Sequence, residues 1–254
     1  MKTITTFVLL LFFTFSTYSQ NKGRIEYQMV LGFMNFAEFN SSLIFDNEKS
    51  LFTYKAKSGG ELHKNSESSL EHNFTIIDTT TNIILIDKKK NLLFESHNKE
   101  KNFFTYEKLP KLKWELLPET KVFKNITCFL AKTNFRGRVY YAWYAPEIPV
   151  LYGPWKLYGL PGLIIEAYDE KKEVIFQFSK IQIPYKYDFD TINNQIDKSD
   201  KISLLEYLKK NNFFNNDKIE NQIKSKFPRG LSVKVEVKRT GVELNFNDLL
   251  NDKN

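Results

Sequence analysis

The sequence predicts a mainly β protein, a curved antiparallel sheet or partial barrel with two short C-terminal helices. Two observations lead to this fold class. Phenylalanine and tyrosine are abundant, with 23 and 13 copies among 254 residues, and both favour strands. Apolar residues also recur at every second position in many short runs joined by short polar connections, which is typical of consecutive hairpins. A sheet with so many strands must curl or close to protect its edges.

The expected strands follow one another between residues 23 and 183. They are Gly23 to Leu31, Ala37 to Phe45, Ser50 to Ala56, Phe74 to Asp78, Asn82 to Asp87, Leu92 to Ser96, Phe103 to Leu109, Val122 to Asn134, Val139 to Tyr144, Leu163 to Tyr168 and Val174 to Ile183. The connections are hairpin loops such as Asp169 to Glu173.

The alternating pattern is interrupted twice. Lys57 to Asn73 carries little apolar material and is expected to form a surface loop. From Pro184 onward the strand pattern gives way to helical signals. Ser203 and Glu206 form a capping box ahead of a first helix. A second helix is expected near Asp217 to Lys226.

A late hairpin is expected after these helices, formed by Leu231 to Val237 and Val242 to Phe246. The sequence contains no internal repeat and no convincing linker. Residues 20–254 are therefore expected to form a single β-rich domain.

Residues 1–19 have the pattern of a cleavable signal peptide. Lys2 gives a short positive start, Phe7 to Phe15 is almost entirely apolar, and a polar stretch ends at Ser19. A membrane anchor would need about 20 apolar residues, and the run from Ile4 to Phe15 is shorter. We expect export, cleavage near Ser19, and a mature chain without a transmembrane segment.

The formal charge of the chain is +7, but the basic residues are spread thinly. Nucleic-acid binding would require lysine and arginine to cluster with stacking aromatics, so no nucleic-acid partner is expected. Cys128 is the single cysteine, which makes an intramolecular disulfide impossible. Its alternating surroundings favour a small buried hydrophobic residue over a reactive thiol.

The sequence offers little support for an enzyme. His63, His72 and His97 lie in polar, loop-like surroundings without metal-ligand spacing. No nucleophile elbow, phosphate-binding loop or dinucleotide fingerprint occurs. We therefore expect no metal site, no cofactor and no catalytic residues.

A hydrolase that uses loop carboxylates is the alternative from another functional class. Glu147, Glu166 and Asp169 lie in or just after the proline-rich and glycine-rich stretch described next. Glu166 and Asp169 are separated by an odd number of positions, so on one strand they should point to opposite faces. Glycosidase-type chemistry would need the two carboxylates to face each other across a cleft.

Glu147 to Ile164 is the most informative stretch of the chain. Proline restricts the backbone and glycine permits positive φ, so their close spacing specifies a rigid, repeatedly turning loop. Tyrosine, tryptophan and arginine dominate binding hot spots, and a rigid loop loses little entropy on binding. The candidate binding residues are Arg136, Arg138, Trp143, Tyr144, Tyr152, Trp155, Lys156 and Tyr158.

The same residues also have a structural interpretation. Trp155 and Leu160 are suited to plug the open end of a curved sheet, with Arg138 stacked on Trp143. Aromatic residues are more often buried than used for binding. The sequence leaves both interpretations open.

The hexapeptide Gly159-Leu160-Pro161-Gly162-Leu163-Ile164 resembles the name-giving motif of the GLPGLI family, exported proteins of Bacteroidetes-type bacteria without an assigned biochemical role. Upstream segments also match that family in order and spacing. They are Cys128 to Lys132, Phe135 to Arg138 and Ala142 to Tyr144. The resemblance implies a periplasmic or outer-envelope location, and some relatives are encoded near TonB-dependent outer-membrane receptors.

These observations favour an exported, non-enzymatic binding or envelope accessory protein. Its partner is expected to be an outer-membrane receptor, another envelope protein, a peptide or a lipid. A periplasmic hydrolase and a structural envelope protein without a ligand are the two alternatives.

Overall fold

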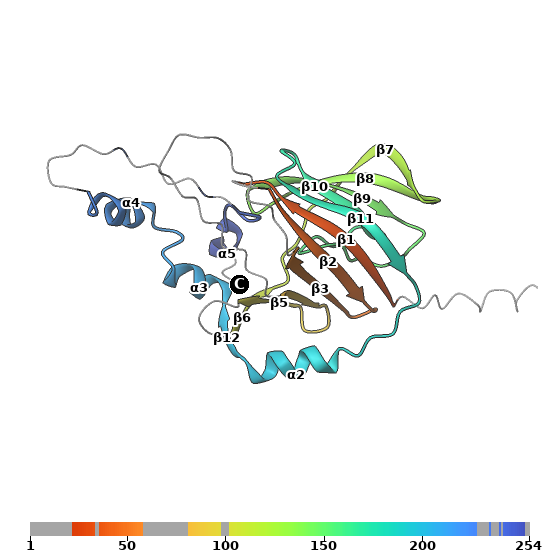
Figure 1. Cartoon of the computed structure of the whole chain (residues 1–254), viewed down its shortest axis with the longest axis horizontal. Helices are drawn as coiled ribbons and strands as arrows, with labels where there is room; N and C mark the ends of the chain where they lie inside the picture. The colour runs from red at the N-terminus through yellow and green to blue at the C-terminus, as the bar shows by residue number, and fades with distance from the viewer. Residues whose placement is uncertain are drawn as a thin grey trace, which may run out of the picture.

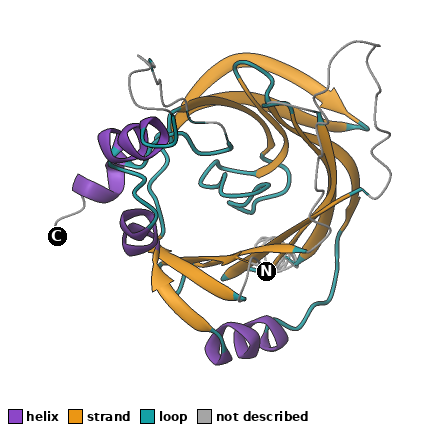
Figure 2. Cartoon of the chain, turned by 60° about the vertical axis from the view of Figure 1, so that its left-hand side comes forward, coloured by secondary structure: helices purple, strands orange, loops and turns teal. Residues whose placement is uncertain are grey.

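The computed structural model describes residues 22–33, 36–57, 81–97, 102–227, 234, 239 and 241–251. Within these ranges, twelve strands form one sheet in the order β12-β6-β5-β4-β3-β2-β1-β11-β10-β9-β8-β7. Figure 2 shows that the sheet curves around a loop lying inside it. Neighbouring strands are antiparallel, except that β12 runs parallel to β6. The predicted fold class, a curved and mainly antiparallel sheet that does not close, is therefore confirmed.

The strand boundaries agree closely with the sequence pattern in most places (Figure 1). The strands are β1 (Gly23–Leu31), β2 (Ala37–Phe45), β3 (Lys49–Ala56), β4 (Asn82–Asp87), β5 (Leu92–His97), β6 (Phe103–Lys108), β7 (Glu115–Phe123), β8 (Ile126–Phe135), β9 (Arg138–Ala145), β10 (Leu163–Asp169), β11 (Val174–Gln182) and β12 (Asp200–Ser203).

The predicted strand Val122 to Asn134 was wrong. Val122 to Asn134 is divided by a turn at Lys124 and Asn125, whose φ angles are 45° and 71°. Two consecutive positive φ values produce a tight hairpin turn, but lysine at the first position gives little warning of it. Strand β7 before the turn was missed because Pro118 interrupts it. Proline is tolerated there because β7 is the last strand of the sheet.

Four short helices lie within the described residues. They are α2 (Asp190–Lys198), α3 (Leu204–Lys210), α4 (Asn216–Lys224) and α5 (Asn247–Asn251). The predicted cap of α3 is confirmed, because the Ser203 side chain accepts a hydrogen bond from the Glu206 amide at 3.2 Å. Helix α4 corresponds to the second predicted helix, whereas α2, α5 and β12 were not predicted. No helix in the described ranges has both the length and the hydropathy needed to cross a membrane.

The late part of the chain differs from the prediction. Val242 to Phe246 is not a strand, and its expected partner, Leu231 to Val237, lies outside the described residues except for Lys234. The predicted strand Phe74 to Asp78, most of the predicted loop Lys57 to Asn73, and the predicted signal peptide also lie outside the described residues.

Alternation along the strands distributes apolar side chains between two clusters. On β2, Leu43 belongs to the large cluster that also contains the loop after β9, whereas Ile44 belongs to a second cluster with α2. Leu85 and Ile86 on β4 divide in the same way. Successive strand residues point to opposite faces, so the sheet is covered on both sides in this region. This arrangement places the loop after β9 within the curve of the sheet.

Candidate functional site

The loop between β9 and β10, residues 146–162, is called here the GLPGLI loop. Its turns depend on unusual backbone angles, with φ of 94° at Gly159 and 56° at Trp155. A side chain at Gly162 would place its Cβ 2.3 Å from the Ala145 carbonyl oxygen, so only glycine fits there. Tyr152 and Tyr158 form an isolated antiparallel bridge across the loop. The glycines of the hexapeptide motif are therefore required by the backbone conformation of the loop.

The GLPGLI loop buries most of its large side chains. Trp155 is 3% exposed, and its ring packs 5.6 Å from that of Phe135 and 5.7 Å from that of Tyr140. Tyr152 is also buried. Tyr158 is partly buried, and its hydroxyl donates a hydrogen bond to the Pro110 carbonyl. The structure thus places Trp155 and Tyr152 in the core.

The two aromatic candidates on β9 occupy different surroundings. Tyr144 is buried and its ring lies 6.1 Å from that of Phe129. Trp143 is partly exposed and packs against Phe123, at 6.5 Å between ring centroids. The expected stacking of Arg138 on Trp143 was wrong, because the two residues are an odd number of positions apart on β9 and so point to opposite faces. The Arg138 guanidinium instead lies 4.8 Å from the ring centroid of Phe33.

Arg138 is buried and bound on several sides. Its Nη1 donates to Asp169 at 2.6 Å and to Glu173 at 2.7 Å. Its Nε and Nη2 donate to the Gly241 carbonyl at 3.0 and 2.7 Å. Charge-assisted bonds of this kind are stronger than neutral ones. Arg138 therefore connects the sheet to the C-terminal segment.

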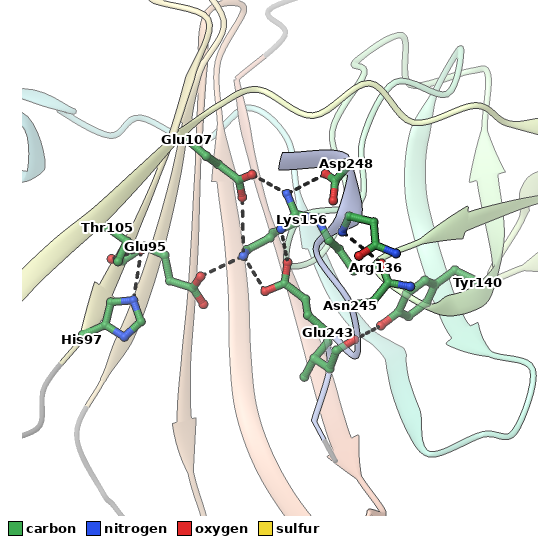
Figure 3. A network of polar contacts seen from close by, with 12 residues as sticks. Glu95, His97, Thr105, Glu107, Arg136, Tyr140, Lys156, Glu243, Asn245 and Asp248 are labelled. Carbon is green, nitrogen blue, oxygen red and sulfur yellow. Dashed lines mark hydrogen bonds and ion pairs between the residues drawn. The ribbon is translucent and has the colours of Figure 1, made fainter. Parts of the chain in front are cut away.

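Six charged residues from distant parts of the chain meet beside the GLPGLI loop, as Figure 3 shows. This polar cluster consists of Glu95, Glu107, Arg136, Lys156, Glu243 and Asp248. The Lys156 side chain is fully buried, and its Nζ lies 2.8 Å from Glu95, 2.7 Å from Glu243 and 3.8 Å from Glu107. Buried charges require partners of this kind. The cluster joins β5, β6, the GLPGLI loop and the C-terminal segment.

Arg136 is the second cation of the polar cluster. It occupies the turn between β8 and β9 with φ of 50°. Its Nη2 lies 2.5 Å from Glu107 and 3.0 Å from Asp248, and its Nη1 lies 3.5 Å from Glu243. With two cations facing four carboxyl groups, the cluster carries an excess of negative charge when every carboxyl group is ionised.

Burial and the neighbouring charges together determine the protonation of the cluster. Burial raises the pKa of Glu243 to about 7, and the Lys156 ammonium only partly opposes this effect. Burial also disfavours ionisation of Glu95, but Lys156 outweighs it and lowers the pKa of that carboxyl group. Burial alone would lower the pKa of Lys156, yet the surrounding carboxylates raise it. Lys156 therefore remains charged, and Glu243 is the group that titrates near neutral pH.

The C-terminal segment, residues 241–251, lies across the β8–β9 turn. The Tyr140 hydroxyl donates to the Val242 carbonyl at 2.9 Å. The amides of Leu244 and Asn245 both donate to the Arg136 carbonyl, at 2.7 and 3.2 Å. Three of the predicted binding residues, Arg136, Arg138 and Lys156, thus contact this segment.

Each carboxylate of the hydrolase hypothesis has a partner of its own. Glu147 accepts a hydrogen bond from the Thr127 amide at 2.7 Å, and Glu166 pairs with Lys121 at 3.6 Å. Asp169 binds Arg138. In the register with β9, Glu166 lies opposite Trp143 and Asp169 opposite Tyr140. The predicted opposite orientation of Glu166 and Asp169 is therefore confirmed.

Cys128 is buried, as predicted, and burial raises the pKa of its thiol to about 12. The expectation that His97 lies in a loop was wrong. His97 ends β5, bonds to Thr105 at 3.0 Å and stacks on the Phe103 ring at 5.0 Å. His63 and His72 lie outside the described residues. The described ranges contain no group of three residues arranged to hold a metal ion.

Sequence reasoning missed the four carboxyl groups of the polar cluster. Glu95 and Glu107 lie in apolar strands, and an isolated charge in such a strand is the one local signal of a buried ion pair. Glu243 gave no signal, because the hairpin prediction placed Val242 to Phe246 in a strand, and Asp248 lies beyond that predicted strand.

Comparison with known proteins identifies relatives of part of the chain. Residues 135–166 match a family model described as "Protein of unknown function (Porph_ging)". This match covers β9, the GLPGLI loop and the start of β10. No curated protein matches the chain.

The fold resembles that of PNGF-II, solved in two crystal forms. One form gives a TM-score of 0.51 at 15% identity, and the other gives 0.50 at 16% identity. In both, the similarity covers 73% of this chain but 32% of PNGF-II. The chain thus corresponds to about a third of that longer protein. At this level of identity the similarity shows the fold alone.

Proposed function

We propose that the chain is an exported, non-enzymatic binding or envelope accessory protein that recognises a partner polypeptide. The observation that carries this proposal is the way residues 241–248 are held. Side chains of the sheet and of the GLPGLI loop bind their carbonyl and carboxylate groups. Donors directed at backbone carbonyls recognise extended polypeptide.

The GLPGLI resemblance supports an envelope partner. An outer-membrane receptor of a TonB-dependent system is the partner class that this resemblance implies.

The export part of the proposal is tested by fractionating the producing cells. The mature protein is expected in the soluble envelope fraction, beginning near Gln20, because the apolar run before Ser19 is too short to span a bilayer. N-terminal sequencing measures this directly. An intact Met1 recovered in washed inner membranes contradicts it.

The binding part is tested by passing envelope extracts over immobilised folded chain, with chemically unfolded chain as the matched control. The proposal predicts that a discrete envelope polypeptide is retained by the folded chain alone. Retention of lipid without polypeptide, or no selective retention, contradicts it. Cleavage of a retained component favours the hydrolase alternative.

A further inference from the structure

The C-terminal segment is bound to the rest of the chain in the manner of a peptide ligand. Two consecutive carbonyls, of Gly241 and Val242, accept hydrogen bonds from Arg138 and Tyr140. The next amides bond to the Arg136 carbonyl. The segment adds no strand to the sheet, so its position depends on these side-chain donors and on the two amide bonds to the Arg136 carbonyl. A separate peptide of the same sequence could form the same hydrogen bonds, because all of them join the segment to Arg136, Arg138 or Tyr140.

Two side chains of the segment act as anchors. The Glu243 carboxyl group enters the polar cluster beside Lys156. Three residues later, Phe246 is 5% exposed and clusters with Leu204 and Leu208 of α3. The Phe246 ring also lies 4.6 Å from the Arg136 guanidinium. A charged anchor and an aromatic anchor on one short segment are typical of peptide recognition.

Gly137 lets the segment approach the sheet closely. Its φ is 83°, and an added Cβ would lie 3.0 Å from the Leu244 Cβ and 3.3 Å from the Asn245 amide nitrogen. The β8–β9 turn thus leaves room for a second backbone, in a conformation that favours glycine.

The C-terminal segment leaves some buried polar atoms of the cluster without hydrogen-bond partners. Among the described residues, Arg136 Nε and Nη1 and Glu107 Oε1 are buried on the sheet side of the cluster without a hydrogen-bond partner. Arg136 Nη1 lies 3.5 Å from Glu243, and Glu107 Oε1 lies 3.8 Å from Lys156, which is too far for a hydrogen bond. Buried polar atoms without partners are costly. Another occupant that reached these atoms would bind more favourably than the segment does.

We propose that the surface formed by Arg136, Arg138, Tyr140, Lys156 and α3 is a peptide-binding site whose present occupant is the chain's own residues 241–248. The partner is an extended peptide with a glutamate followed three positions later by a phenylalanine. This inference rests on the proposed function, because it specifies the partner of the same binding protein. The C-terminal segment then competes with the partner and reduces its apparent affinity.

The experiment uses the full chain with Glu243→Lys and Phe246→Ala, which weakens the internal segment and leaves the sheet side intact. A labelled peptide with the native sequence of residues 241–251 is titrated in by fluorescence anisotropy. We expect the variant to bind this peptide at least about tenfold more tightly than the native chain, in which the tethered segment competes. A matched peptide with the same two substitutions should bind at least about tenfold more weakly.

Folding is checked by circular dichroism and thermal melting. If the double variant does not fold, Gly137→Ala displaces the segment by steric contact and keeps every side chain of the site. A folded variant that binds both peptides equally overturns the inference, and so does failure of both variants to fold, since the segment is then part of the fold. A partner retained from extracts but not displaced by the native peptide also overturns it, while the proposed binding function stands.

Discussion

The GLPGLI loop and the C-terminal segment meet at the contact between Lys156 and Glu243, yet they are held by different forces. Trp155, Leu157 and Leu160 of the loop are buried in the large apolar cluster. The segment is held mainly by hydrogen bonds and ion pairs, with Phe246 as its buried apolar anchor.

This difference predicts different behaviour. Burial of apolar surface stabilises in proportion to its area and is not screened by salt. Hydrogen bonds and ion pairs contribute smaller net amounts and depend on pH. The loop should therefore be released only when the whole domain unfolds, whereas the segment should be released by a local opening.

The largest expected effect belongs to the loop. Trp155→Ala should lower the free energy of unfolding by about 3 to 5 kcal/mol, because it empties a large aromatic site in the core. Denaturant titration measures the loss. Trp143→Ala, at a partly exposed position on neighbouring β9, is the matched control and should cost about 1 kcal/mol. Equal losses of unfolding free energy for the two variants would contradict the assignment of Trp155 to the core and of Trp143 to the surface.

Lys156 should give the next largest effect. Lys156→Met retains much of the volume but leaves Glu95 and Glu243 without their cation, so we expect a loss of about 3 kcal/mol. Lys121→Met removes the exposed pair with Glu166 and should change stability by less than about 0.5 kcal/mol. Glu243→Gln added to Lys156→Met should recover part of the loss. Without such recovery, Lys156 would act through packing alone.

The pH dependence of stability tests the polar cluster. Because the pKa of Glu243 is raised to about 7 when folded, folded chain holds a proton that unfolded chain releases. The Glu243 contribution is full below about pH 4.5 and is lost as pH rises through about 7. The lowered pKa of Glu95 acts in the opposite sense and matters only at lower pH. The charged groups that face Glu243 are Lys156, Glu95, Arg136 and Glu107, and Asp248 pairs with Arg136 behind them.

Melting temperatures between about pH 5 and pH 8 measure this effect. Native chain should melt at a lower temperature as the pH rises through this range, and the decrease should be smaller in Glu243→Gln. Identical pH profiles would show that Glu243 does not titrate in this range.

Cys128 gives the smallest effect and reports on global opening. It is buried in the same cluster as the loop, so folded protein should resist alkylation and react only after denaturant is added. Cys128→Ala should cost about 1 kcal/mol. Alkylation of Cys128 in native buffer, at the rate at which the C-terminal segment opens, would contradict the claim that the segment opens without unfolding of the core.

Much of the sheet could be predicted from the sequence, because period-two alternation directly reflects burial of one strand face. The limits of β1, β2 and β4 agree with the prediction residue for residue. The hairpin turn at Lys124 and Asn125 could not be predicted, since a turn with positive φ usually contains glycine.

The candidate site was only partly predictable. Arg136, Arg138 and Lys156 were identified because cations interleave with aromatics near the loop. The carboxyl partners of Arg136 and Lys156, which are Glu95, Glu107 and Glu243, come from strands and a C-terminal segment far away in the chain. Only the tertiary fold places them together, and no local pattern records that proximity.

Native-state hydrogen exchange tests most directly whether the C-terminal segment is a detachable occupant. The Leu244 amide, bonded to the Arg136 carbonyl, should exchange at least about 100-fold faster than the Gly159 amide, bonded to the Leu151 carbonyl. Gly159 should exchange only through global unfolding. Equal exchange of the two amides, both following global stability, would contradict the account.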